Sequence, residues 1–163
     1  MNLKDAKWKL ITPWWPSSTI RLKALGLHWR DGRLLASEVN RDDGTLKGVR
    51  PLGGTVEFEE TWQDALIREF QEEIGVRIEL IGDPIVLENI YSHHGAMGHE
   101  ILFISEIIFS PNAYETDEFI EYCENNGDPC IARWFDPFTL LDQGISLYPE
   151  GLLSQLTTWK ERS

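Results

Sequence analysis

The chain has 163 residues, of which 42% are hydrophobic and 11% aromatic, and its formal net charge is -12 at pH 7. This length predicts a single domain over residues 1–163 with a real core, and the composition excludes wholesale disorder. The acidic balance disfavours nucleic acid as a partner, because nucleic acid is usually held by a basic surface. A small nucleotide stays open as a ligand, since metal ions can supply local positive charge.

The N-terminal sequence MNLKDAKWKL lacks the apolar centre of a signal peptide. No apolar run approaches the roughly 18 residues of a membrane span. Cys123 and Cys130 are the only cysteines, and their spacing is typical neither of a zinc site nor of a redox motif. We therefore expect a cytoplasmic protein with reduced thiols and no membrane partner, with a disulfide between the two cysteines as the lesser alternative.

The first half of the chain predicts a hairpin, a glycine loop and a helix. Residues 20–30 and 33–40 are apolar runs joined by Asp31-Gly32, which is a hairpin signal. A polar turn, RDDGTLKG, then leads to Gly53 and Gly54. The helix is expected between Thr61, which starts a motif similar to a capping box, and Gly75, a typical C-terminal stop.

The second half reads as strands with little helix. Residues 76–81 and 85–91 are strand-like and separated by Gly82-Asp83-Pro84, and residues 99–109 form an apolar strand after the glycine-bearing loop SHHGAMGHE. The apolar spacing of residues 151–160 predicts a closing helix. Between them we expect a polar loop or short helix at 112–124, a short strand at 131–135 and a helical turn at 136–141.

The expected helix separates acidic from apolar side chains. At 100° per residue, Glu69, Glu72 and Glu73 share one arc, and the apolar residues of the helix lie on the neighbouring arc. Carboxylates this close repel each other, and a hard divalent cation removes that cost. Ligation by oxygen alone suits Mg2+ or Mn2+ and not zinc. Taken alone, the acidic segment REFQEE is also compatible with an ordinary solvated helix face.

The wider spacing favours a site over a solvated face. Residues Gly54 to Val76 fit the pattern G-x5-E-x7-R-E-U-x-E-E-x-G-U, in which U is apolar. Seven fixed identities at average residue frequencies arise by chance about once in 10^8 start positions. On this segment the chain resembles the Nudix hydrolases, which cleave nucleoside diphosphates linked to a further group X. The matching residues are Gly54, Glu60, Arg68, Glu69, Phe70, Glu72, Glu73, Gly75 and Val76.

The resemblance implies an α/β/α sandwich with a mixed sheet, a pyrophosphohydrolase activity and a small nucleotide substrate. It assigns the metal ion to Glu69, Glu72, Glu73 and the carbonyl of Gly53. The segment itself gives Arg68 a bracing role, because it lies one turn before Glu72 and can hold a carboxylate with two hydrogen bonds. Gly54 and Glu60 are expected to support the loop.

The proton acceptor for the attacking water is less defined. Glu69 is one candidate, and Glu100, near the start of a strand after a glycine-bearing loop, is the other. The alternative is that Glu100 is an acid at a strand end, exposed to solvent, without a role in the reaction. The acidic residues of the later loop compete for the same role; they are Glu115, Glu118 and Glu121.

Several alternatives stay open. A nucleotide-binding module that senses its ligand without cleaving it would keep the fold but not the reaction. X is open among ADP-ribose or a nucleotide sugar, a dinucleoside polyphosphate and a nucleoside triphosphate. Trp14 and Trp15 are candidates for stacking on a base or for packing, and a homodimer is possible by analogy with the family.

Overall fold

The computed structural model describes residues 15–162, so Trp14 lies outside the described residues. Its helices are α1 (Trp62–Ile74) and α2 (Leu152–Arg162), with a short 3-10 helix η1 (Leu141–Gln143) before α2. The strands are β1 (Ile20–Leu27), β2 (Trp29–Arg30), β3 (Arg33–Asn40), β4 (Leu46–Arg50), β5 (Gly53–Thr55), β6 (Ile78–His93), β7 (Ala96–Phe109), β8 (Phe119–Cys123), β9 (Pro129–Phe135) and β10 (Ser146–Leu147).

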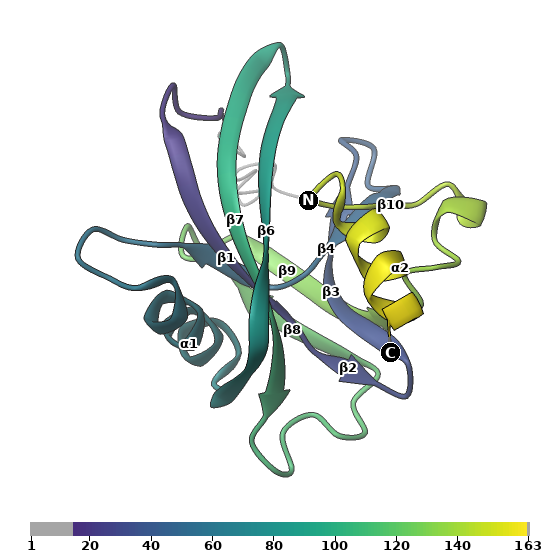
Figure 1. The fold of residues 1–163 in the computed structure, drawn as a ribbon. Helices are drawn as coiled ribbons and strands as arrows, with labels where there is room; N and C mark the ends of the chain where they lie inside the picture. The colour runs from purple at the N-terminus through teal and green to yellow at the C-terminus, as the bar shows by residue number, and fades with distance from the viewer. Residues whose placement is uncertain (1–14, 163) are drawn as a thin grey trace, which may run out of the picture.

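The strands form two sheets that lie between the two helices (Figure 1). The first sheet is mixed and has the order β5-β1-β7-β6, with β1 and β7 parallel and the other neighbours antiparallel. The second sheet has the order β10-β4-β3-β9-β8, and β2 pairs with β3. This arrangement confirms the α/β/α sandwich with a mixed sheet.

Alternation along β1 shows how the sequence makes two cores. Ala24 belongs to the cluster that contains the buried face of α1, whereas its neighbour Leu25 belongs to the cluster that contains α2. Successive side chains of a strand point to opposite faces, so one strand serves both layers. The apolar arc predicted for α1 is buried as expected, at Leu66, Phe70 and Ile74.

The ends of α1 are set by the residues that predict them. The side chain of Thr61 accepts a hydrogen bond from the backbone N–H of Asp64 at 3.1 Å. Gly75 adopts the left-handed conformation, with φ 67°, and its N–H bonds to the carbonyl of Gln71 at 3.1 Å. Both caps satisfy backbone groups that a helix end leaves unpaired. The helix that carries the acidic residues is therefore held at both ends.

Of the other predicted elements, some are confirmed by the structure and others are wrong. The Asp31-Gly32 hairpin is confirmed, because Arg30 pairs with Arg33, and so is the closing helix. The loop or helix expected at 112–124 is wrong in part, since β8 occupies its end. The break expected at Gly82-Asp83-Pro84 is also wrong. The residues lie inside the single strand β6 as a bulge, which an edge strand tolerates.

The segment before Glu100 also differs from expectation. β6 and β7 pair up to His93 and Ala96, so only His94 and Gly95 form the turn, with φ 49° and 80°. Two central residues with positive φ are typical of a type I′ hairpin. Glu100 consequently lies inside a long ladder and not beside a flexible loop. Among residues 15–162, no helix is long and apolar enough to cross a membrane.

Candidate active site

Glycine is required at positions 53 and 54, before α1, for two different steric reasons. Gly53 has φ 152°, and a side chain there would meet the carbonyl oxygen of Ala24 in β1. A side chain at Gly54 would meet the carboxyl group of Glu69, with Oε1 only 2.5 Å from the added carbon. Thus Gly53 lets β5 pair closely with β1, and Gly54 leaves the space that the Glu69 carboxylate fills.

Arg68 connects three of the predicted carboxylates. Its Nε and Nη2 donate to the two oxygens of Glu60 at 2.7 and 2.9 Å, which is the planar two-bond geometry of a guanidinium and a carboxylate. Its Nη1 donates to Glu69 at 2.9 Å and to Glu72 at 3.2 Å. Nη2 also donates to the Thr55 carbonyl at 3.2 Å, so Arg68 ties α1 to β5.

Glu60 anchors the loop between β5 and α1. Its Oε1 accepts the N–H of Glu57 at 3.1 Å in addition to the two bonds from Arg68. The hydrogen bond from Arg68 is the main cause that lowers the pKa of Glu60 to about 2. Glu60 is therefore ionised throughout the neutral range, and its negative charge in turn raises the pKa of Arg68.

Glu73 has the opposite electrostatic state. Burial raises its pKa to about 8, and the charge of Glu69 adds to the shift, followed by that of Glu124. A hydrogen bond with Glu69 and the charge of Glu72 act in the same direction. The helix thus holds carboxyl groups close enough that the protein alone disfavours ionising all of them, as expected from their shared arc.

The carboxylates are close but are not pre-arranged as a metal site. In the described part of the chain, no three His, Cys, Asp or Glu side chains form a group that could already hold a metal ion. The contacts explain this, because Arg68 engages Glu69 and Glu72 while Glu73 contacts Glu69. The chemistry of the donors still suits a hard cation, since all are carboxylate oxygens and the crowding around Glu73 is relieved by positive charge.

Glu100 lies apart from this group. It is 5% exposed and sits on β7 opposite Arg21 of β1. Its nearest charged contact is Arg50 of β4, with Nη2 3.9 Å from Oε1. The groups that shift the pKa of Glu73 do not include Glu100. The strand-end position exposed to solvent is therefore excluded, and the neighbours of Glu100 include Arg50 and the side chain of Tyr91, with which it forms a hydrogen bond.

The later acidic residues fare differently from each other. Glu115 accepts the N–H of Asn112 at 2.9 Å, which is a local loop contact, and Glu118 and Glu121 are exposed. Glu124, which follows β8, acts electrostatically on Glu73 and on Lys23. The sequence interpretation missed Glu124, although the alternation in FIEYC and the turn NNGDP are a hairpin signal that would have placed it near a sheet end.

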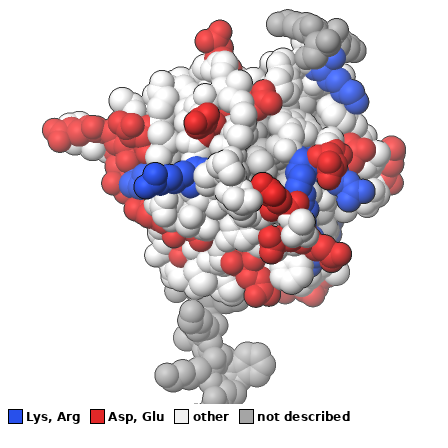
Figure 2. Space-filling view, turned by 90° about the horizontal axis from the view of Figure 1, so that it is seen from below, with Lys and Arg blue, Asp and Glu red and all other residues white. Residues whose placement is uncertain are grey.

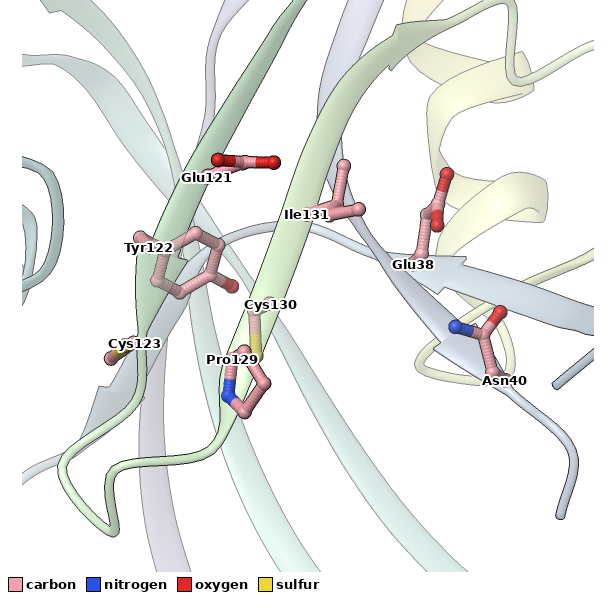
Figure 3. A pocket seen from close by; sticks show the side chains of 8 residues that line it. All are labelled: Glu38, Asn40, Glu121, Tyr122, Cys123, Pro129, Cys130 and Ile131. Carbon is pink, nitrogen blue, oxygen red and sulfur yellow. The ribbon is translucent and has the colours of Figure 1, made fainter. Parts of the chain in front are cut away.

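A pocket of about 530 Å3 opens along the second sheet, between β3 and the β8–β9 hairpin (Figure 3). None of the helix carboxylates lines it. Tyr122 and Cys130 connect the pocket to the helix carboxylates electrostatically. The charge of Glu73 contributes to raising the pKa values of both groups, after burial as the main cause. Its lining residues are Glu38, Asn40, Glu121, Tyr122, Cys123, Pro129, Cys130 and Ile131.

Figure 2 shows acidic side chains spread over the visible face and basic ones in a few separate groups. This distribution follows the formal net charge of -12 of the sequence.

A comparison with protein families matches the NUDIX domain over residues 24–147, which is most of the chain and includes the whole motif. The chain belongs to the Nudix family. It is consequently a hydrolase that acts on pyrophosphate bonds. No curated protein sequence matches the chain at a significant level.

Solved structures of Nudix proteins have the same fold at low sequence identity. The E. coli ORF135 protein matches with a TM-score of 0.59 and 20% identity, covering 87% of this chain and 91% of that one. The MutT NUDIX hydrolase from Burkholderia pseudomallei matches with a TM-score of 0.52 and 22% identity, covering 74% and 85%. The MutT protein from Methanosarcina mazei Go1 gives 0.53 and 15%, covering 93% and 98%. At these identities the likeness concerns the fold.

Proposed function

We propose that this Nudix hydrolase is a metal-dependent pyrophosphohydrolase of nucleoside diphosphates linked to a group X. Water attacks a phosphorus atom of the P–O–P bridge, and the substrate is a nucleotide sugar or ADP-ribose, a dinucleoside polyphosphate or a nucleoside triphosphate. The observation that carries the proposal is the carboxylate set that Arg68 holds beneath Gly54. This set consists of motif residues, and the space left by Gly54 for Glu69 gives a steric reason for their spacing.

The residues that would hold Mg2+ or Mn2+ are Glu69, Glu72 and Glu73, with the Gly53 carbonyl as a further hard ligand. Support comes from Glu73, whose pKa is raised to about 8 by burial and by Glu69, because a bound cation would favour its ionised form. When bound, the ion neutralises phosphate oxygens and lowers the pKa of bound water.

The chain's own residues then have distinct tasks. Arg68 positions Glu69 and Glu72 and ties them to the ionised Glu60, so that the carboxylates keep their direction. Glu69, which is 3% exposed, and Glu100 are the two candidates for accepting the proton of the water. Glu69 has the advantage of lying in the carboxylate group itself.

The pocket of β3, β8 and β9 gives room for the nucleoside or for X. Its volume of about 530 Å3 lies within the range of small-molecule sites, and Tyr122 and Cys130 bring it within electrostatic reach of Glu73. We place the reaction in a reducing cytoplasm, where Cys123 and Cys130 would keep the free-thiol state that they have in the structure.

The test is a panel of nucleotides incubated with Mg2+ or Mn2+, with and without excess EDTA, followed by identification of the products. We expect cleavage of a phosphoanhydride bond in at least one class of substrate and its loss in EDTA. Full turnover in EDTA would refute metal dependence. Tight nucleotide binding without any product would instead favour the ligand-sensing module.

A further inference from the structure

A group of basic side chains lies on the other side of β5 from the helix carboxylates. Lys23 pairs in register with Thr55 of β5 and lies on the same face of the first sheet as Arg21 and Glu100, because residues alternate along β1 and Arg21 is opposite Glu100. Arg50 reaches Glu100 from the second sheet, at 3.9 Å. We call Lys23, Arg21 and Arg50 the cation cluster.

Lys23 is the unusual member, because it is only 9% exposed. In the part of the chain that the structure describes, its ammonium group has no hydrogen-bond or ion-pair partner. Burial, followed by the charges of Arg50 and Arg21, lowers the pKa of Lys23 to about 8, and Glu100 and Glu124 offset only part of this shift. An ammonium group beside two further cations favours a nearby anion, and groups with shifted pKa values are frequent at ligand sites.

The cation cluster gathers three positive charges in a chain of net charge -12. Arg50 is 3.9 Å from the buried Glu100, and Arg50 and Arg21 both lower the pKa of Lys23, after burial as the main cause. The cluster is also open to a ligand, because the side chain of Arg50 is 33% exposed. An anionic group that binds here would gain charge-assisted hydrogen bonds and offset the repulsion between Lys23 and the two arginines.

β5 connects this cluster to the candidate active site. The Thr55 hydroxyl accepts a hydrogen bond from Arg21 at 3.3 Å, while the Thr55 carbonyl accepts one from Arg68 at 3.2 Å. Glu124 acts on both Lys23 and Glu73, which places it within electrostatic reach of the two groups. Thr55 of β5, the edge strand of the first sheet, thus contacts both the carboxylate side and the cluster.

We propose that the cation cluster binds an additional phosphate of the substrate, so that the chain prefers nucleotides with three or more phosphates over nucleoside diphosphates linked to an uncharged group. This inference rests on the proposed function, in which the helix carboxylates serve the two phosphates of the cleaved bridge. A third phosphate adds negative charge beside the cluster. A sugar at the same place adds none.

The test compares Lys23→Met with the wild type, because methionine keeps the length and apolar stem of the side chain and removes the charge. Lys160→Met is the matched control, since Lys160 is exposed on α2. With Mg2+, each protein is assayed on the four nucleoside triphosphates and on ADP-ribose. We expect Lys23→Met to lose about 10- to 100-fold in kcat/KM for the triphosphates, mainly through KM, the range for a hydrogen bond to a charged group. The kcat/KM for ADP-ribose should change by less than about 3-fold, because a charge that the substrate does not contact has only a small effect on its binding.

Titration with inorganic tripolyphosphate in EDTA separates this inference from the proposed function. The wild type and Lys160→Met should bind it, and Lys23→Met should bind about 10-fold more weakly. If the chain cleaves no nucleotide, the proposed function fails while this titration still tests the cluster. Equal tripolyphosphate binding by all three proteins, or an equal loss for triphosphates and ADP-ribose, would overturn the inference.

Thermal unfolding tests whether Lys23 serves the fold instead. Removing one of three neighbouring cations should leave the Tm of Lys23→Met equal to or above that of the wild type. A lower Tm would contradict a ligand-binding role. Should this variant not fold, Arg50→Gln replaces it at a half-exposed position, with the same direction expected for KM and for tripolyphosphate binding.

Discussion

The polar groups on the two sides of β5 are assembled in opposite ways. The carboxylate side is local in sequence, since Glu60, Arg68 and the helix acids lie within one segment and contact each other directly. The cation cluster takes one residue from β4 and two from β1, and its carboxylate comes from β7. In the local group Arg68 contacts three carboxylates, whereas no hydrogen bond or ion pair of Lys23 is found among the described residues. The first group forms within one contiguous segment, and the second needs the complete fold.

Their electrostatic states differ in the same way. On the carboxylate side, burial and then the neighbouring carboxylates raise the pKa of Glu73, and on the other side burial and then Arg50 and Arg21 lower that of Lys23. A metal-bound polyphosphate would supply positive charge from the metal ion to the carboxylate side and negative charge from its phosphates to the cationic side. Variants that remove one charge at a time should affect kcat on the carboxylate side and KM on the cationic side.

The largest effect is expected for Glu73→Gln, which keeps the shape of the side chain and removes a charge from the carboxylate side. We expect kcat to fall by on the order of 10^2 or more, as for the loss of other single electrostatic stabilisers. Steady-state kinetics at saturating Mg2+ measure this. An unchanged kcat at every Mg2+ concentration would show that Glu73 is not part of the site.

Arg68→Lys should have the next largest effect. Lysine keeps the charge but cannot make the two parallel bonds to Glu60 while also bonding Glu69 and Glu72. By comparison with residues that orient metal ligands, we expect a loss of about 10- to 100-fold in activity or in metal affinity. A Mg2+ titration of the rate separates these two. Wild-type values in both with an intact fold would exclude the bracing role.

The contrast between these two regions also explains what the sequence could predict. The α1 helix, its caps at Thr61 and Gly75, and the closeness of its acids follow from helical spacing and nearby cap residues. The bulge at Gly82-Asp83-Pro84 could not be predicted so easily, because the pairing of β6 with β7 overrides the local turn signal. The contact between Arg50 and Glu100 joins different sheets, and no spacing in the sequence encodes it.

Glu100→Gln tests which of the two regions this residue serves. Its contact with Arg50 favours a positioning role, for which KM should rise about 10-fold with little change in kcat, the weight of one hydrogen bond to a charged group. A proton acceptor would instead lower kcat by about 10^2- to 10^4-fold. The same substitution at Glu118, an exposed residue before β8 that does not line the pocket, provides the comparison. A large fall in kcat alone would assign Glu100 to the reaction and not to the cation cluster.

The smallest expected effect is on stability as a function of pH in EDTA. The pKa of Glu73 is about 8 in the folded protein, above the value of about 4.3 of an unfolded glutamate. The folded state thus binds more protons between these values, so this contribution to stability is complete below about pH 4.3 and is lost as pH rises through 8.

The Tm should fall by several degrees more in the wild type than in Glu73→Gln between pH 5.5 and 8.5. Mg2+ should reduce this fall, because it stabilises the ionised carboxylate. Parallel Tm curves for the two proteins would show that Glu73 does not carry the charge imbalance of the carboxylate side.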